Sequence, residues 1–146
     1  MYTARVSELM YPLATYNADS LGISTSSSGY VNMENYHRAW LFVNVGDMAA
    51  GGTLDAGIQQ AQDAAGTGVK AITGKTITQL TQAGGDGNDL VCIELQTEEL
   101  DVDNGFEFIR FYLTVAGNSV EVSATLFGCE SRYMPVPTTN WQEIVG

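Results

Sequence analysis

The chain has 146 residues, with 17 acidic against six basic side chains and a formal net charge of -11. A chain of this length can bury the core of one domain without disulfides or metals. Its negative charge opposes binding to nucleic acid or to an anionic membrane surface, and a neutral or basic protein partner is easier to accommodate. No stretch approaches the roughly 20 apolar residues of a membrane span. The first residues lack the pattern of a secretion signal, so we expect the protein to be made in a cytoplasm.

The first 30 residues differ from those that follow. Aromatic and aliphatic side chains are spread among polar ones without a sustained helical or strand period, and the Ser/Thr run 24–28 ends at Gly29. This pattern predicts an extended N-terminal arm over residues 1–30 that ends in a flexible loop. Two placements of the arm are open. It lies across its own domain, or its aromatic side chains dock onto a neighbouring subunit.

Residues 31–132 read as a series of strands and turns that form one β-sandwich domain. The segment 36–47 is dominated by aromatic and branched side chains, contains no proline and ends at Gly46-Asp47. It therefore predicts a strand with both faces largely covered. One face carries Ala39, Leu41, Val43 and Val45, and the other carries Tyr36, Trp40 and Phe42.

The stretch Thr53 to Ala65 is ambiguous, because its apolar residues fit two periods. Leu54, Ile58 and Ala61 fall at helical spacing, whereas Leu54, Ala56 and Ile58 fall at strand spacing. Local propensity slightly favours a helix, but the surrounding strands favour another member of a sheet. We predict a strand here.

Three further strands are predicted to pair in sequence as antiparallel neighbours. The segment 90–100 is followed by Asn104-Gly105, the dipeptide best suited to a two-residue hairpin turn, and then by the return strand 106–115. A second turn at 117–119 leads to alternating apolar residues over 120–126. Six to eight short strands with Gly-rich turns predict an all-β protein, a jelly-roll-like antiparallel β-sandwich. The prolines that follow keep the tail 133–146 extended.

Two loop motifs suggest ligand sites but fail on spacing. Gly74-Lys75-Thr76 resembles the end of a phosphate-binding loop, yet the position that requires glycine holds Val69. The acidic turns at 101–105 and 86–89 resemble the opening of a calcium loop. Neither has glycine at the sixth position with glutamate at the twelfth. We expect neither a cofactor nor a metal site.

Catalytic side chains are also sparse. His37 is the single histidine, and Cys92 and Cys129 lie in apolar segments where free thiols pack as small hydrophobic groups. A disulfide between the cysteines requires neighbouring strands and close Cα atoms. The carboxylates of residues 98–103 fit a solvated strand end better than an acid and base pair. We predict that the chain is not an enzyme.

Aromatic and arginine side chains form the candidate binding set, because both residue types are enriched at protein interfaces. For an arginine in an apolar strand, the alternative is an outer-face position paired with a carboxylate such as Glu94. The candidate partner-binding residues are Tyr2, Tyr11, Tyr16, Arg38, Trp40, Arg132, Tyr133 and Trp141.

Several short segments resemble, in the same order, a group of small proteins encoded close to the major capsid protein in tailed bacteriophages and prophages. The segments span roughly residues 31–135 and are Val31–Arg38, Val45–Met48, Ile58–Ala61, Asp63–Gly66, Ile77–Leu80, Glu98–Asp101 and Arg132-Tyr133. The chain thus resembles the capsid cement, or decoration, proteins of jelly-roll type. The resemblance implies a structural virion protein on the outer capsid surface, made in the bacterial host cytoplasm, without enzymatic activity or cofactor.

The implied partners are the phage major capsid protein and further copies of this chain, a homodimer being favoured over a trimer. Such a protein would stabilise the shell by bridging major capsid protein subunits, and symmetric self-association would place it on a local symmetry axis. Residues 1–30 and 133–146 would extend the contact surface. Two alternatives stay open: a carbohydrate- or receptor-binding jelly roll on the virion, with Trp40 or Trp141 stacked on a sugar, and a head-completion or tail protein.

Overall fold

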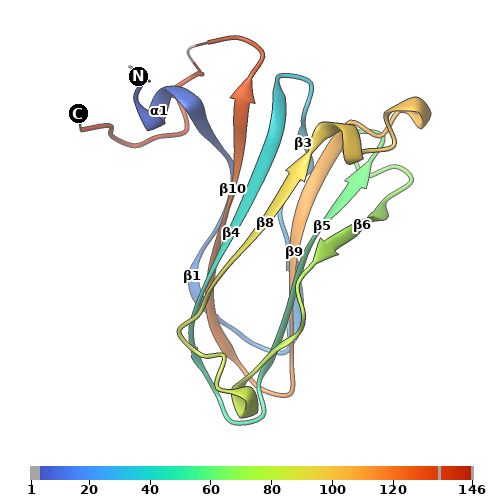
Figure 1. The fold of residues 1–146 in the computed structure, drawn as a ribbon. Helices are drawn as coiled ribbons and strands as arrows, with labels where there is room; N and C mark the ends of the chain where they lie inside the picture. Colours follow the sequence, from blue (N-terminus) through green and yellow to red (C-terminus); the bar gives the residue numbers. More distant parts are fainter. Residues whose placement is uncertain (1–3, 135, 146) are drawn as a thin grey trace.

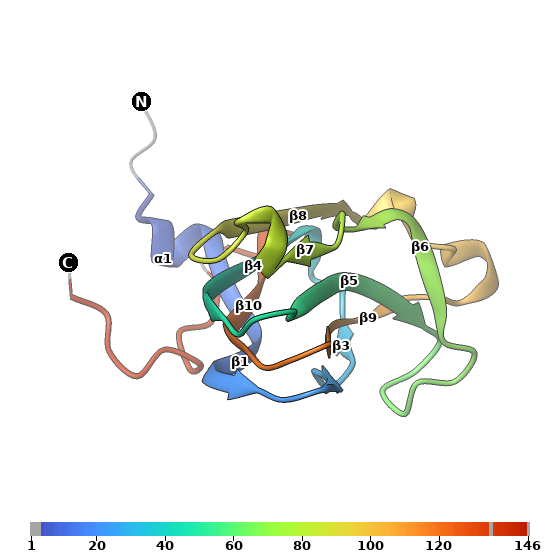
Figure 2. The same cartoon turned by 90° about the horizontal axis from the view of Figure 1, so that it is seen from below.

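Two antiparallel sheets face each other across one apolar core in the computed structural model, which describes residues 4–134 and 136–145 (Figure 1). Figure 2 shows the two sheets as layers seen from below. Sheet A has the order β1 (Met10–Leu21), β10 (Val120–Ser131), β4 (Tyr36–Met48) and β8 (Leu90–Gln96). Sheet B has β2 (Ser24–Ser27) and β3 (Val31–Asn32) beside β9 (Phe108–Ala116), then β5 (Thr53–Ala61), then β6 (Lys70–Thr76) and β7 (Leu80–Thr81). Short helical turns are α1 (Val6–Leu9), η1 (Gln82–Gly84), η2 (Thr97–Glu99) and η3 (Val102–Asn104).

The chain path is that of a jelly roll. It crosses from one sheet to the other after β1, β3, β4, β7, β8 and β9, and stays within a sheet only between β2 and β3 and from β5 through β7. Every strand pair is antiparallel. This topology confirms the predicted all-β, jelly-roll-like antiparallel β-sandwich.

The core follows the alternation of side chains along each strand. In β4, the predicted inner row of Ala39, Leu41, Val43 and Val45 is fully buried. The predicted outer row is less completely covered than expected, because Trp40 and Phe42 are only half-buried. Tyr36, assigned to that outer row, is buried.

The ambiguous stretch 53–65 is a strand over Thr53–Ala61, as predicted for that part, and residues 62–65 lie in the turn that follows. Leu54, Ala56 and Ile58 are buried, and β5 pairs with β9 along its whole length. Its central place in sheet B, with strands on both sides, stabilises the extended form over the weak local helical preference.

The predicted run of three paired strands is wrong in its pairing, although its alternation is right. β8 belongs to sheet A, β9 to sheet B and β10 to sheet A, so consecutive strands face each other across the core. Asn104-Gly105 does not form a hairpin turn. Asn104 ends η3, and Gly105 follows with φ 80° in a connection that crosses between the sheets. The inner faces of β8, β9 and β10 are all apolar. The same alternating sequence therefore fits strands that face each other from opposite sheets and strands that pair within one sheet.

The crossing between β9 and β10 depends on one glycine. Gly117 has φ 72°, and a Cβ at this position would collide with the carbonyl oxygen of Gly51 in the β4–β5 loop. The short Gly117–Ser119 turn is therefore correct in position, but it connects two sheets instead of two paired strands.

The predicted N-terminal arm is wrong for residues 10–27. Residues 10–21 form the edge strand β1, and the Ser/Thr run belongs to β2, where Thr25 Oγ1 lies 2.9 Å from Thr114 Oγ1 of β9. The sandwich thus begins at Met10 instead of residue 31. Two register shifts in β1, between Pro12 and Ala14 and between Tyr16 and Asp19, interrupt the alternation that would reveal a strand.

The C-terminal tail contains no helix or strand among its described residues, in keeping with the proline-rich sequence. Part of it packs against the domain, whereas Ile144 and Val145 near its end are exposed. Val136 is buried, Tyr11 Oη lies 2.9 Å from Thr139 Oγ1, and Asn140 Nδ2 donates to the Pro12 carbonyl at 2.8 Å. The tail therefore covers part of the β1 edge, at the same end of the sandwich as α1 (Figure 1).

Candidate partner-binding surface

The outer face of sheet A presents its side chains in rows that run across the strands. Antiparallel partners point to the same face, so the register defines each row. One row holds Pro12, Phe127, Trp40 and Glu94, the next holds Thr15, Thr125, Phe42 and Cys92, and the row toward α1 holds Met10, Cys129, Arg38 and Gln96. We call Trp40, Phe42, Phe127 and Trp141 the aromatic face.

The rings of the aromatic face touch one another in a continuous series. Trp40 and Phe42 have centroids 5.2 Å apart at 85°, and Phe42 and Phe127 have centroids 6.0 Å apart at 81°. Trp141, from the tail, tilts against Phe127 at 6.2 Å. Edge-to-face packing of this kind is favourable for aromatic rings. All four side chains are half-buried, so the cluster is ordered and keeps part of its apolar surface open.

Polar groups border these rings. Trp40 Nε1 donates to Glu94 Oε1 at 2.5 Å, which orients the indole, and Arg38 forms an exposed ion pair with Glu130 at 2.9 Å. The indole nitrogen of Trp141 is buried and has no hydrogen-bond partner within the described part of the chain. An apolar centre with a polar rim is the arrangement found in protein interfaces.

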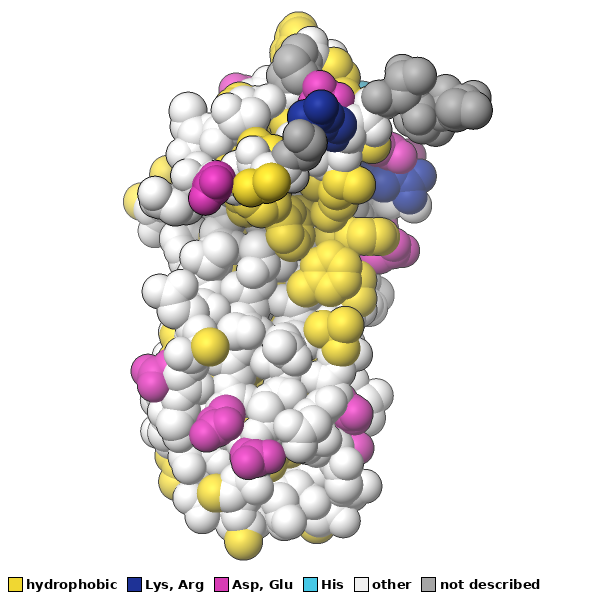
Figure 3. Space-filling view, turned by 90° about the vertical axis from the view of Figure 1, so that its left-hand side faces the viewer, with side chains coloured by type: hydrophobic (Ala, Val, Ile, Leu, Met, Phe, Trp, Pro, Cys, Tyr) yellow, Lys and Arg dark blue, Asp and Glu magenta, His cyan; other side chains and the backbone are white. Residues whose placement is uncertain are grey.

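A shallow groove of about 440 Å³ continues the aromatic face toward the N-terminus. Its lining combines apolar side chains of α1 and β1 with the polar rim, and consists of Val6, Leu9, Met10, Arg38, Trp40, Glu94, Cys129 and Glu130. Figure 3 views the side of the molecule on which β1 lies. Hydrophobic side chains gather in its upper half, whereas the lower half is mostly uncharged polar side chains and backbone with scattered acidic side chains.

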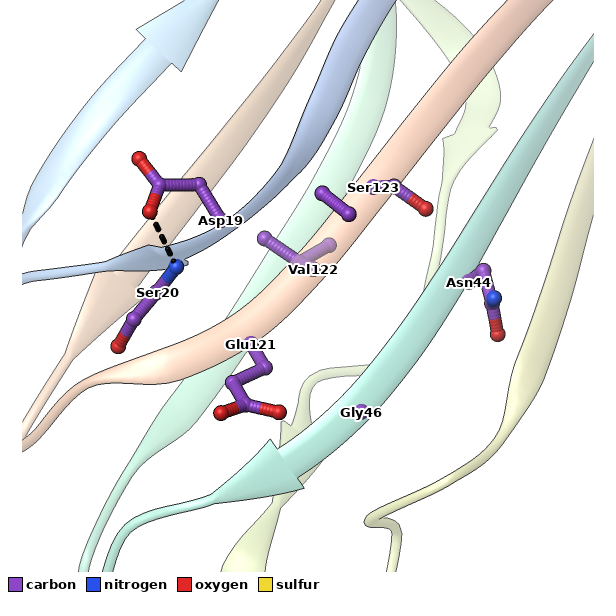
Figure 4. Close-up of a pocket in the computed structure, with 8 residues that line it drawn as sticks. Asp19, Ser20, Asn44, Gly46, Glu121, Val122 and Ser123 are labelled. Atoms are coloured by element: carbon purple, nitrogen blue, oxygen red, sulfur yellow. Dashed lines mark hydrogen bonds between the residues drawn. The ribbon is translucent and has the colours of Figure 1, made fainter.

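That lower half holds a depression of about 290 Å³ lined by residues of β1, β4 and β10 (Figure 4). The Asp19 carboxylate accepts from the backbone N–H of Ser20 at 2.7 Å and is thus turned toward its own strand. Across residues 4–134 and 136–145, no three His, Cys, Asp or Glu side chains lie close enough to hold a metal ion. No helix in these ranges is long and apolar enough to cross a membrane.

The eight candidate residues do not form one cluster. Arg38, Trp40 and Trp141 come together on the outer face of sheet A, whereas Tyr11 and Tyr16 pack against the core. Burial explains this difference, because Tyr16 pairs with the inward-facing Ala124.

The remaining candidates lie away from the aromatic face. Arg132 and Tyr133 are exposed beyond the end of β10, and the backbone N–H of Arg132 donates to the Asn35 carbonyl at 2.9 Å. Tyr2 lies outside the described residues. Phe127 was not among the predicted residues, although it follows Ser123 and Thr125 on the outer face of β10.

The two cysteines are free and lie on opposite sides of β4 in different rows. Cys129 is half-buried, but Cys92 is exposed, so the expected burial is wrong for Cys92. An edge strand covered on one face only leaves alternate side chains in solvent, whatever their polarity. Burial, and then the charge of Glu130, raise the pKa of Cys129 to about 11. Burial, and then Glu94, raise the pKa of Cys92 as well.

We expect Cys92 to be alkylated well before Cys129 in the native protein. With a pKa of about 11, only about one in a thousand Cys129 thiols is ionised at pH 8, and the thiolate is the reactive form. Iodoacetamide labelling followed by peptide mass spectrometry measures the order. In urea-unfolded protein both sites should react at similar rates. Faster labelling of Cys129 in native protein would contradict this account.

No protein-family profile matches the chain, and no curated protein sequence matches it. Among solved structures, the SPBc2 prophage-derived protein YomS overlaps 82% of this chain and 93% of its own, with 10% identity and a TM-score of 0.44. A protein of broad bean stain virus overlaps 88% and 93% of the two chains, with 10% identity and the same TM-score of 0.44. An acetyl xylan esterase from the rumen bacterium Butyrivibrio proteoclasticus overlaps 90% of this chain and 32% of its own, with 10% identity and a TM-score of 0.35. Structural similarities with TM-scores this low support no conclusion about function.

Proposed function

We propose that the chain is a structural virion protein that binds the outer surface of a phage capsid and stabilises the shell by bridging major capsid protein subunits. The observation that carries the proposal is the aromatic face, a connected set of half-buried rings on the outer side of sheet A. Exposed aromatic clusters with polar rims are typical centres of protein binding energy. The resemblance of residues 31–135 to capsid cement proteins gives the partner.

The position of the aromatic face suits a structural contact. Trp40, Phe42 and Phe127 belong to β4 and β10, the two inner strands of sheet A, whose opposite faces are fixed in the core by residues such as Leu41 and Leu126. A surface built on paired strands loses little conformational freedom when it binds. Such a surface can contact many equivalent capsid sites in the same geometry.

Charge restricts the capsid surface that fits this face. The net charge is -11, and two acidic residues, Glu94 and Glu130, lie beside Trp40 and Arg38. Like charges brought together in an interface are unfavourable, so the matching capsid surface is neutral or basic around an apolar centre. Added salt should therefore slow the association more than it speeds dissociation.

The test is a binding assay with capsids that lack this protein. Purified chain is mixed with capsids from a phage deleted for its gene, and the capsids are pelleted. The proposal predicts saturable co-sedimentation, with many copies per particle, and a higher temperature of capsid disruption. Absence of binding would contradict it, and a few copies at a single vertex would instead favour a head-completion or tail protein.

A further inference from the structure

Three of the four sheet edges carry features that block pairing with another chain. The β1 edge has two register shifts, a proline at position 12, and the tail residue Asn140 bonded to the Pro12 carbonyl. The β6 edge carries Lys70 and Lys75 and a register shift against β5. The other edge of sheet B, beside β9, is formed by two short strands, β2 and β3, which are four and two residues long. Bulges, lysines, prolines and short strands are known means of preventing edge pairing.

The remaining edge, β8, has none of these features over most of its length. Its sequence, Leu90–Gln96, contains no proline, lysine or arginine, and its register with β4 is unbroken. Leu90 is 67% exposed, and Cys92 is exposed beside it on the outer face. Protection begins only toward the other end, where Lys75 Nζ donates to the Glu94 carbonyl at 2.8 Å.

The direction of the free backbone groups follows from the contacts at that end. The Glu94 carbonyl and the Gln96 N–H bind side chains, Lys75 Nζ and Glu99 Oε2 respectively, and so point away from β4. In an antiparallel ladder the direction alternates with each residue. Leu90 and Cys92 therefore also point their N–H and C=O groups away from β4. In the described part of the chain, no side chain bonds to the backbone of either residue.

We propose that two copies of the chain pair through their β8 edges, antiparallel and centred on Cys92. In this register Cys92 donates to and accepts from the partner's Cys92, and Leu90 lies opposite the partner's Glu94. The two Glu94 carboxylates are thus kept apart. In a register centred on Ile93, every hydrogen-bonded pair would need the Glu94 carbonyl or the Gln96 N–H, which are already bonded. In the Cys92 register the central pair needs neither group, and the Glu94 carbonyl is required only in the flanking pairs with Leu90. The occupant of the edge is a second copy, because the same free groups complement themselves about a two-fold axis.

The dimer would extend sheet A of one copy into sheet A of the other. A two-fold axis perpendicular to the sheet keeps both outer faces on one side, so the two aromatic faces would point the same way. If the proposed capsid binding holds, this gives two attachment points in one rigid unit, which increases avidity and allows one unit to bridge neighbouring subunits. The pairing itself does not depend on the capsid function.

The first test compares the full-length protein with Cys92→Pro by sedimentation equilibrium. Proline removes the outward N–H at position 92 without removing a hydrogen bond to β4, and edge strands tolerate proline. By symmetry two intermolecular hydrogen bonds are lost, so dimerisation should weaken at least about tenfold. Cys92→Ser keeps the N–H and should dimerise as the original does. Near-ultraviolet circular dichroism confirms that each variant is folded.

The second test locates the pairing by cross-linking. In a Cys129→Ser background, mild oxidation should give a dimer linked through Cys92, because opposed residues in an antiparallel pair have Cα atoms about 5.5 Å apart, within disulfide range. The Cys92→Ser protein, which retains Cys129, should give none. A protein that stays monomeric at submillimolar concentration, or equal dimerisation by Cys92→Pro, would overturn the proposal. A monomer that still coats capsids would overturn the dimer and leave the capsid function standing.

Discussion

Replacing Trp40 and Phe127 together by alanine is expected to abolish capsid binding at concentrations where the original protein saturates the particle. The two residues are cross-strand partners on the outer face of sheet A, and Phe42 contacts both rings. Truncating an interface hot spot costs at least about 2 kcal/mol, so two such losses correspond to roughly a thousandfold weaker binding. Co-sedimentation over a range of protein concentrations measures the change.

Two variants on the same strand and face serve as matched controls. Ser123→Ala removes a hydroxyl group opposite Asn44, and Thr125→Ala removes a hydroxyl and a methyl group opposite Phe42. Both leave all four rings in place, so binding should change far less than in the double variant. Thermal unfolding of all variants separates loss of binding from loss of fold. If the double alanine variant coats capsids as well as the Thr125→Ala control, the aromatic face is not the contact.

Phe111→Ala is expected to cause the largest loss of stability among single substitutions at the core. Phe111 lies in the middle of β9, is 1% exposed and belongs to the largest fully buried side chains. Truncation of such a phenylalanine typically costs about 3–5 kcal/mol, because a cavity remains where the ring was. Since domains of this size are stable by about 5–15 kcal/mol, the variant should still fold, with a midpoint lowered by about 10 °C.

Urea unfolding followed by tryptophan fluorescence measures this loss. Phe111→Leu fills most of the same space and should lose clearly less than half as much stability as Phe111→Ala. Equal losses for the two variants would show that the site does not depend on the packing of the ring. A loss of less than about 1 kcal/mol for Phe111→Ala would contradict the placement of β9 at the centre of the core.

Side-chain alternation predicted which faces are buried better than it predicted which strands pair. The inner rows of β4, β9 and β10 were all identifiable from their apolar spacing. The alternation shows which side chains of a strand point into the core. It does not show whether the next strand along the chain lies beside that strand in the same sheet or faces it from the opposite sheet. For this reason the strands before and after Asn104-Gly105 were recognised, but they were wrongly predicted to pair as a hairpin.

The strand β1 was missed for a different reason. Its two register shifts and the proline at position 12 remove the period on which strand prediction depends, and its pairing with β10 is a contact between distant parts of the chain. The Ser/Thr run of β2 reads as a loop by composition. It is held in place by the ladder with β9. Tertiary context that local sequence does not contain decided both cases.

The candidate surface was predictable only in part. Trp40 and Arg38 follow from the outer row of β4, and Trp141 was a candidate by residue type alone. Its position against Phe127 depends on contacts far apart in sequence. The inward orientation of Tyr16 depends likewise on the register of β1 with β10.

Sugar binding is the other function that exposed tryptophans suggest. Trp40 is bonded to Glu94 and edge-packed on Phe42, Trp141 is tilted against Phe127, and both indoles are half-buried. A glycan array with the original protein and Trp40→Ala distinguishes the two functions. Binding of a defined glycan that is lost in Trp40→Ala would favour a receptor-binding role on the virion.

The most direct test of the proposed function is an electron cryomicroscopy reconstruction of the parent virion, with this chain fitted into density outside the main shell. The account predicts density repeated over the icosahedral surface, with the outer face of sheet A, including Trp40 and Phe127, against the major capsid protein. Density confined to the tail or to one vertex, or absence of the chain from the particle, would contradict it.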